Sequence, residues 1–382
     1  MIETVFGRPD QTLRQKLWQI QWLFVFMLVL AAGVGFAMLY SAADGNADPW
    51  ANRHVIRFAA GIMVLIGVAV VDIRIWLRYA YVIYALVLVL LGAVEISGFA
   101  GMGARRWLNF GFVNIQPSEL MKIALVLALA RYFHGGSVDD IRRPLYLIPP
   151  VLIVLAPLGL VLRQPDLGTG LILMITGAAL FFLAGVRFWK FMLVGLAGLM
   201  TLPIAWQSLH NYQRRRILTF LDPESDPLGA GYHIIQSKIA FGSGGLAGRG
   251  FLKGTQGHLN FLPEMQTDFI FTMLAEEFGL IGGLALLGLY TLLLVYGIAI
   301  SLRSRSHFGR LLGMGVSVTF FLYVFINMAM VIGLIPVVGV PLPLISYGGT
   351  AMLTLLFGFG LLMGVWVHRD VLIGRRGAVG DL

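Results

Sequence analysis

Four carboxylates stand at the ends of apolar runs in this chain: Glu119, Asp166, Glu264 and Asp268. A carboxylate held at the edge of an apolar region can accept a proton from a hydroxyl group, which is the role of a general base. The chain has no cysteine, which excludes thiolate metal sites, cysteine nucleophiles and disulfides. Its seven histidines are scattered over separate loops. Carboxylates must therefore carry any acid–base chemistry.

The segment Gln116-Pro117-Ser118-Glu119 is typical of a helix start. Proline suits the first helical position, and a carboxylate in the first turn complements the helix dipole. Lys122 follows one turn later in apolar surroundings, where an unpaired ammonium would cost several kcal/mol. We therefore expect Lys122 to pair with Glu119. A simple helix cap would explain Glu119 alone, whereas the added lysine favours a functional pair.

Asp166 and Asp268 also precede apolar runs, so each can be read as a helix cap or as a functional group. The run that begins at Asp268 extends over 268–300, which as one helix would measure about 50 Å. The hydrocarbon core of a bilayer is about 30 Å thick. The start of this helix must therefore project outward or tilt. Glu276 and Glu277 are then expected to line a polar cavity or reach the headgroup layer.

Arginines accompany these carboxylates. Arg53, Arg105 and Arg106 are candidates for binding a phosphate, because a guanidinium matches phosphate oxygens in a bidentate manner. Arg57 and the 214–216 run fit better with lipid headgroups.

The elements that must position these groups are membrane helices. The 382 residues are 58% hydrophobic and 12% charged, with a mean hydropathy of +0.84. These values indicate an all-α integral membrane protein, because a spanning helix needs about 20 apolar residues and such runs recur along the chain. We expect ten transmembrane helices, at 18–41, 54–71, 77–97, 115–133, 145–162, 169–186, 189–208, 268–300, 311–334 and 349–367.

Loop charges set the expected orientation. Of the 28 lysines and arginines, sixteen fall in the loops on one side and five in the short loops on the other. The positive-inside rule then places both termini in the cytoplasm and the four carboxylates on the external side. The net charge of +9 reflects this topology, and nothing indicates a nucleic-acid site. We interpret residues 1–382 as one polytopic membrane domain.

One long extracytoplasmic loop, 209–267, is expected between helices seven and eight. Its residues 232–241 have the pattern of a short amphipathic helix lying on the membrane. The glycine run 242–250 either wraps a phosphate or simply permits turns.

Seven motifs occur in a fixed order along the chain. They are Leu39-Tyr40-Ser41-Ala42, Arg105-Arg106-Trp107-Leu108, Gln116-Pro117-Ser118-Glu119-Leu120-Met121-Lys122, Gln164-Pro165-Asp166-Leu167-Gly168-Thr169, Gly254-Thr255-Gln256, Leu262-Pro263-Glu264 with Thr267-Asp268-Phe269-Ile270-Phe271, and Pro341-Leu342-Pro343-Leu344-Ile345-Ser346-Tyr347-Gly348-Gly349. Together they resemble the SEDS family (shape, elongation, division and sporulation proteins). Within this family, the chain resembles the RodA-type elongation branch more than the FtsW-type division branch. This resemblance rests on the short tails, on residues 16–20 at the entry to the first helix and on the 254–256 motif.

The resemblance implies a peptidoglycan glycosyltransferase that polymerises lipid II at the outer face of the bacterial inner membrane. By similarity, Asp268 matches the essential aspartate of the family, and Glu119, Lys122 and Asp166 match its other important polar positions. Many relatives have histidine where this chain has Gln266. A role for that histidine does not carry over.

The chemistry expected of this site is an inverting sugar transfer. Asp268 would take the proton of the acceptor hydroxyl, and cations would hold the departing diphosphate. We expect Arg53, Arg105, Arg106 and Lys122 to supply these cations. Glu119 and Asp166 would orient Lys122 or hold a divalent cation, Mg²⁺ or Mn²⁺. Gln116 and Glu264 are expected to contact substrate. Ser346, in the broken entry to the last helix, either lines the lipid groove or forms a structural bend.

By resemblance, a class B penicillin-binding protein within an elongation complex is the expected partner. Two other functions fit parts of the pattern. A lipid II flippase or transporter would also be polytopic with broken helices, but its polar site should lie near the bilayer midplane. A non-catalytic scaffold would explain the long loop but needs no carboxylate cluster.

Overall fold

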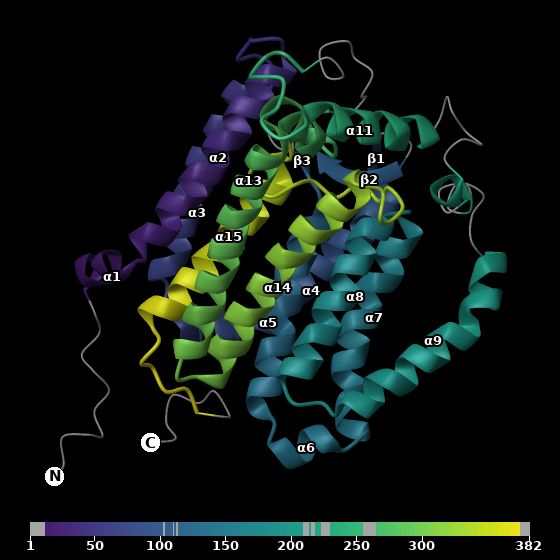
Figure 1. Cartoon of the computed structure of the whole chain (residues 1–382). Helices are drawn as coiled ribbons and strands as arrows, with labels where there is room; N and C mark the ends of the chain where they lie inside the picture. The colour runs from purple at the N-terminus through teal and green to yellow at the C-terminus, as the bar shows by residue number, and fades with distance from the viewer. Residues whose placement is uncertain are drawn as a thin grey trace.

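Long helices that run alongside one another make up most of the protein in the computed structural model (Figure 1), which describes residues 12–101, 104–109, 111, 114–208, 214, 218–222, 230–254 and 265–374. The helices are α1 (Leu13–Gln19), α2 (Trp22–Ala42), α3 (Ala51–Val70), α4 (Ile73–Ser97), α5 (Pro117–Gly135), α6 (Val138–Arg142), η1 (Leu145–Leu147), α7 (Ile148–Arg163), α8 (Leu167–Leu183), α9 (Phe188–Ser208), α11 (Ala230–Gly244), α13 (Ile270–Arg303), α14 (His307–Val331) and α15 (Gly349–Val367). The strands are β1 (Phe99–Gly101), β2 (Ala104–Asn109) and β3 (Asn114–Ile115).

Each of the ten apolar runs expected from the sequence overlaps one of these helices. Among the described helices, seven are long and apolar enough to cross a membrane, and α8 and the first part of α9 are shorter apolar helices. The expected class, an all-α multi-pass membrane protein, is therefore confirmed, and the count of ten spans remains a prediction.

The centre of the bundle is α5, which contacts α4, α7, α8, α14 and α15. Almost all of its residues are buried, so it has no polar face toward solvent. Any charged side chain on this helix must therefore find its partner inside the protein.

A sharp kink divides α13 at Gly279, whose φ of 65° and ψ of −160° are not helical. The segment 245–250 fills the break. The amides of Arg249 and Gly250 donate to the carbonyls of Glu276 and Glu277 at 3.0 and 2.9 Å, and the amide of Leu280 donates to Gly245 at 3.0 Å. The helix that the sequence predicts to be too long for the bilayer is thus two helices, with the backbone groups at the break hydrogen-bonded.

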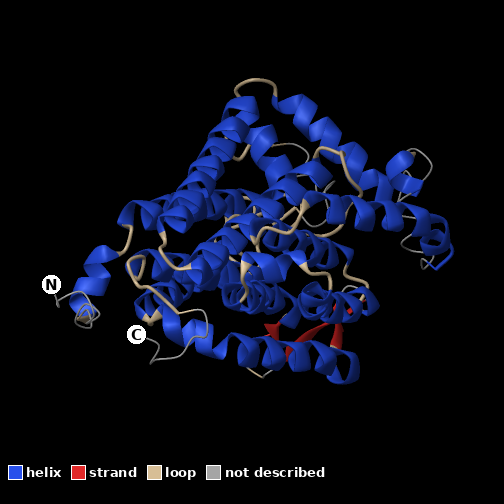
Figure 2. Ribbon diagram, turned by 90° about the horizontal axis from the view of Figure 1, so that it is seen from below, coloured by secondary structure: helices blue, strands red, loops and turns tan. Residues whose placement is uncertain are grey.

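A small antiparallel sheet with the order β1-β2-β3 connects α4 to α5, and it was not predicted from the sequence. Gly101 pairs with Ala104 between β1 and β2, and Leu108 pairs with Ile115 between β2 and β3. Figure 2 shows these strands at one edge of the otherwise helical molecule.

Two helices lie outside the tight bundle. The expected helix at 232–241 is present as α11, which packs on α13 and α14, and Ser237 Oγ lies 2.9 Å from Thr272 Oγ1 and 2.8 Å from the Val331 carbonyl. In contrast, α9 extends away from the other helices (Figure 1), and most of its side chains from Phe188 to Thr201 are exposed.

Candidate active site

The start of α5 carries a buried ion pair. Pro117 occupies the first turn after the N-cap residue Gln116, and Glu119 lies in the first turn, as expected. Lys122 Nζ is 2.6 Å from Glu119 Oε1, and the two residues are only 1% and 4% exposed. The predicted pairing is confirmed, and it leaves both charges inside the bundle.

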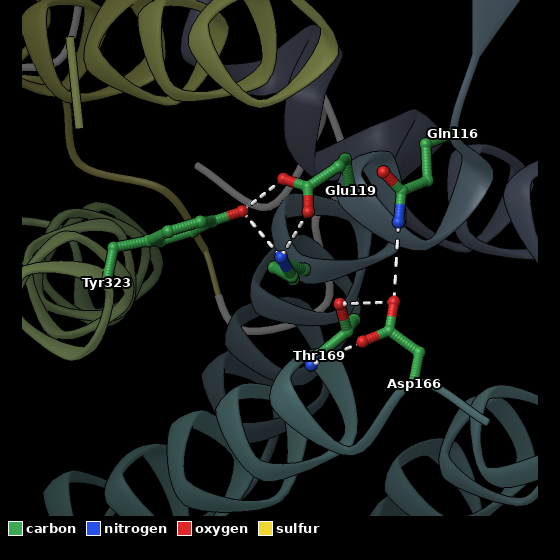
Figure 3. A network of polar contacts seen from close by, with 6 residues as sticks. Gln116, Glu119, Asp166, Thr169 and Tyr323 are labelled. Carbon is green, nitrogen blue, oxygen red and sulfur yellow. Dashed lines mark hydrogen bonds and ion pairs between the residues drawn. The ribbon is translucent and has the colours of Figure 1, made fainter. Parts of the chain in front are cut away.

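Tyr323 of α14 completes this pair. Lys122 Nζ donates to the Tyr323 hydroxyl at 2.5 Å, and that hydroxyl donates to Glu119 Oε2. The ammonium also lies 4.3 Å from the centre of the tyrosine ring. The three groups form a closed network between α5 and α14 (Figure 3). Sequence reasoning missed Tyr323, because a tyrosine within an apolar helix matches no motif.

Asp166 is the N-cap of α8, as one of its two alternatives proposed. Its Oδ1 accepts from the Thr169 amide at 3.1 Å, and its Oδ2 accepts from the Thr169 hydroxyl at 3.0 Å. Oδ2 also accepts from Gln116 Nε2 at 3.3 Å, which joins the start of α8 to the start of α5 (Figure 3). The carboxylate is therefore both a cap and part of a contact between two site helices.

Arg106, on β2, lies against the end of α7. Its Nε donates to the Gln164 carbonyl at 3.2 Å, and its Nη2 donates to the Pro165 carbonyl. Gln164 itself donates from Nε2 to the Leu91 carbonyl at 2.9 Å. Two of the nitrogens expected to bind diphosphate thus hold the turn that precedes Asp166.

Asp268 lies in the turn before α13 and is partly exposed, unlike Glu119 and Asp166. The N-cap position of α13 is Phe269, so the alternative that Asp268 caps this helix is wrong. A Cβ atom built on Gly339 would lie 3.5 Å from Asp268 Oδ2, and Gly339 has a φ of 74°. The carboxylate therefore faces a glycine of the 335–340 segment, whose added Cβ would be in ordinary van der Waals contact with it.

The backbone around Asp268 is fastened from two sides. Asn327 Nδ2, on α14, donates to the Asp268 carbonyl at 3.0 Å and to the Val340 carbonyl at 2.7 Å. Ser346 Oγ donates to the Thr267 carbonyl at 2.5 Å and accepts from the Leu342 amide at 2.8 Å. Ser346 is 3% exposed, so its hydroxyl supports the bend at 341–348, the structural alternative proposed for it.

For several expected site residues the structure describes no contact with the carboxylates. Arg53 is exposed at the start of α3, and no described contact joins it to the carboxylates. Arg105 belongs to β2, but its side chain and the whole of Glu264 lie outside what the structure describes. Arg57, which the sequence pattern assigns to headgroups, has its guanidinium carbon 4.7 Å from the centre of the Tyr347 ring.

The expectation for Glu276 and Glu277 was wrong. Both are buried, at 0% and 1% exposure, so they neither line an open cavity nor reach a headgroup layer. Glu277 Oε1 accepts from the Ser41 hydroxyl, and Ser243 Oγ lies 3.5 Å from Glu276 Oε1. They pack α13 against α2 and the 243–254 segment beside the kink.

A divalent cation does not fit between Glu119 and Asp166. Both oxygens of Glu119 are bonded to Lys122 and Tyr323, so a cation there would lie against an ammonium. Within the described ranges, no group of three or more histidine, cysteine, aspartate or glutamate side chains could hold a metal ion. The positive charge in contact with Glu119 is the ammonium of Lys122.

The arrangement provides a partly exposed carboxylate, Asp268, and a buried charged network, and side chains of α14 contact both the network and the backbone of Asp268. Asp268 is partly exposed and can accept a proton from a bound hydroxyl. Glu119, Lys122 and Asp166 are buried and bonded to protein groups. The side chains that hold the turn of Asp268 are Asn327 and Ser346, which donate to the carbonyls of Asp268 and Thr267.

Comparisons with known proteins show the family. The family model described as "Cell cycle protein", which covers FtsW, RodA and SpoVE, matches residues 20–371. The chain is 44% identical to peptidoglycan glycosyltransferase MrdB of Escherichia coli K12 over 354 residues, 91% of this chain and 94% of that protein. It is 37% identical to stage V sporulation protein E of Bacillus subtilis over 355 residues, 90% and 96% of the two chains.

Solved structures show the same fold. A chain of a peptidoglycan synthase complex, described as coordinating polymerization and crosslinking, aligns with a TM-score of 0.79 and 35% identity, covering 92% of this chain and 98% of that one. The rod shape determining protein RodA of Thermus thermophilus aligns with a TM-score of 0.69 and 30% identity, covering 92% and 98%.

Proposed function

Since this chain belongs to the FtsW, RodA and SpoVE family of cell cycle proteins, we propose that it is a peptidoglycan glycosyltransferase that polymerises lipid II during cell elongation. The observation that carries the proposal is the partly exposed carboxylate of Asp268 in a turn fastened by Asn327 and Ser346. A fixed, partly exposed carboxylate is what a sugar transfer by general base catalysis needs.

The proposed reaction is an inverting displacement. The acceptor 4-hydroxyl attacks the anomeric carbon of the donor sugar, and Asp268 takes the hydroxyl proton as the new carbon–oxygen bond forms. The bond from the anomeric carbon to undecaprenyl diphosphate breaks, and the electron pair leaves with the diphosphate. The enzyme must therefore place one base and stabilise one anionic leaving group.

Positive charge for the leaving group comes from two sources in this proposal. Arg53 and Arg105, on the side of the molecule where α3 and β2 begin, contact the diphosphate directly. Lys122 and Arg106 act on the diphosphate through their charge from inside the protein. They do not contact it directly in this proposal, because their donors already bond to Glu119, Tyr323 and the 164–165 carbonyls. Glu264 is proposed to contact substrate, and Gln116 to hold Asp166. No step passes through a metal ion.

The proposed setting follows from charge and from the relatives. We place the enzyme in the bacterial inner membrane with both termini in the cytoplasm and Asp268 on the periplasmic side, which the loop charges support. We propose a class B penicillin-binding protein as its transpeptidase partner in an elongation complex. The similarity to a chain of a peptidoglycan synthase complex supports this partner.

The test compares native protein with Asp268→Asn, each purified alone and with the partner and incubated with lipid II. A matched control is Asp72→Asn, which makes the same chemical change at the N-cap of α4, far along the chain from the site. We expect glycan polymer from native protein and the control, and none from Asp268→Asn. Polymer from all three would remove Asp268 as the base. No polymer from any partnered sample would favour the flippase or scaffold function.

A further inference from the structure

One face of α14 contacts both the Glu119–Lys122 pair and the backbone of Asp268. Tyr323 and Asn327 are four positions apart, so their side chains lie one above the other on the same face of the helix. They are 1% and 0% exposed, respectively. Two polar side chains buried on one stripe of an apolar helix must each have a specific partner inside the bundle.

The first of these partners is the charged pair of α5. The Tyr323 hydroxyl accepts from Lys122 Nζ at 2.5 Å and donates to Glu119 Oε2. Because one hydroxyl bonds to both members of the pair, the position of α14 along its axis fixes where the ammonium lies (Figure 3).

The second partner is the backbone on either side of the Asp268 carboxylate. A primary amide has two N–H donors, and both of those on Asn327 are used, toward the carbonyls of Asp268 at 3.0 Å and Val340 at 2.7 Å. Val340 follows Gly339, the residue that faces Asp268 Oδ2. One side chain thus ties the turn that carries the carboxylate to the segment that the carboxylate faces.

Resting on the function proposed above, we propose that Asn327 is a positioning residue for the base Asp268, and that α14 sets the separation between this base and the ammonium of Lys122. Polar contacts between membrane helices are common and often only hold helices together. The contacts of Asn327 differ because its acceptors are carbonyls of two non-helical segments, and these two segments meet at the carboxylate.

A positioning role and a general role in packing give different kinetics. Loss of Asn327 should leave donor binding intact and misplace the base, which lowers kcat for lipid II without raising KM. Loss of the Tyr323 hydroxyl should instead displace the Lys122 ammonium, whose positive charge stabilises the diphosphate of the bound donor. Donor binding should then weaken, so KM should rise. A residue that only supports the fold would change the amount of active protein, which lowers apparent kcat and leaves KM unchanged. We therefore express kcat per folded, partner-bound enzyme, so that a loss of folded protein does not count as a loss of kcat.

The experiment measures kcat and KM for lipid II with the partnered enzyme carrying Asn327→Ala, Tyr323→Phe or Thr319→Ala. Thr319 is the matched control, since it is buried on the same helix and its hydroxyl donates to the Gly315 carbonyl of that helix at 2.8 Å. We expect Asn327→Ala to lower kcat about 10- to 100-fold with KM within about 2-fold of native, and Thr319→Ala to change neither. Equal kcat values for Asn327→Ala and Thr319→Ala would overturn the proposal.

A second variant covers the case in which Asn327→Ala does not fold. Asn327→Ser keeps one short hydrogen-bond donor. If both variants fold, its kcat should lie between those of native protein and Asn327→Ala. If Asn327→Ala does not fold, the kcat of Asn327→Ser should still lie below native. Native kcat in a folded Asn327→Ser protein would overturn the proposal. A native enzyme that makes no polymer is a separate result, because it removes the proposed function and is seen before any variant is compared.

Discussion

The ammonium of Lys122 is among the most buried charges in the described part of the chain, and it depends on Glu119 and Tyr323 for stabilisation. Removing one member of a buried pair leaves the other charge without compensation, which typically costs about 3–5 kcal/mol. Replacing both members by neutral groups of similar size costs much less.

We therefore expect Lys122→Met to lower the thermal unfolding midpoint of the detergent-solubilised protein strongly, equivalent to about 3–5 kcal/mol. The double variant Lys122→Met with Glu119→Gln should recover part of that loss. Additive losses in the double variant would show that the two side chains do not depend on each other.

At this scale, sequence predicts contacts between near neighbours and misses those between distant residues. Glu119 and Lys122 lie three positions apart, so helix geometry alone pairs them. Tyr323 is 201 positions from Lys122, and nothing in its local sequence points to that partner. The contact of Arg106 with the carbonyls of 164–165 was likewise missed. These residues are distant in the sequence, and every residue type has a backbone carbonyl.

The kink in α13 is the clearest case at the scale of an element. The length of the apolar run predicts that one straight helix cannot fit the bilayer, but not where it breaks. The break lies at Gly279, with φ at 65°, where a Cβ atom would approach the Gly248 amide nitrogen to 2.4 Å. Only a glycine combines this backbone conformation with such a close contact.

Gly279→Ala should therefore destabilise the protein by several kcal/mol, because it adds backbone strain to a collision with the 245–250 segment. Gly288→Ala is the matched control in the same helix, since its Cβ would have nothing within 4 Å. The control should be neutral or stabilising by up to about 1 kcal/mol. Thermal unfolding of the two variants checks this, and equal midpoints would contradict the account of the kink.

The end of α15 should make stability depend on pH. Burial lowers the pKa of His368, assisted by the nearby Lys16 ammonium and opposed by the Gly364 carbonyl and Asp72. In the unfolded chain this imidazole binds a proton near pH 6.5, whereas in the folded protein it binds only at lower pH. Stability is therefore complete above about pH 6.5 and falls as the pH drops below that value.

The unfolding midpoint of native protein should fall more between pH 7.5 and pH 5.5 than that of His368→Gln, which has no proton to gain. Identical pH dependence in both would show that His368 is not protonated preferentially in the unfolded state.

For the whole molecule, hydropathy predicts where most of the long helices lie, because each membrane helix must satisfy its own backbone hydrogen bonds with a run of apolar residues. The orientation that the loop charges indicate remains a prediction. All ten apolar runs coincide with helices. The β1–β3 sheet was missed because its strands are only three, six and two residues long, too short for a period to emerge.

The orientation can be tested by fusing a reporter that fluoresces only in the cytoplasm after residue 374. We expect fluorescence there and none when the same reporter follows residue 222, in the long loop. The reverse result would place Asp268 on the cytoplasmic side and contradict the proposed polymerisation at the outer face.

The hydrogen bonds that stabilise the kink join segments that are close in sequence, whereas the bond from Tyr323 to Glu119 joins residues 204 positions apart. During synthesis the kink can form as soon as α13 enters the bilayer, while the candidate site must wait for α14. A nascent chain that stops before α14 contains Asp268 and the Asp166 cap, yet has neither Tyr323 nor Asn327. Competence to consume a lipid-linked sugar therefore arises only near the end of translation, and a partly inserted chain is expected to be inert.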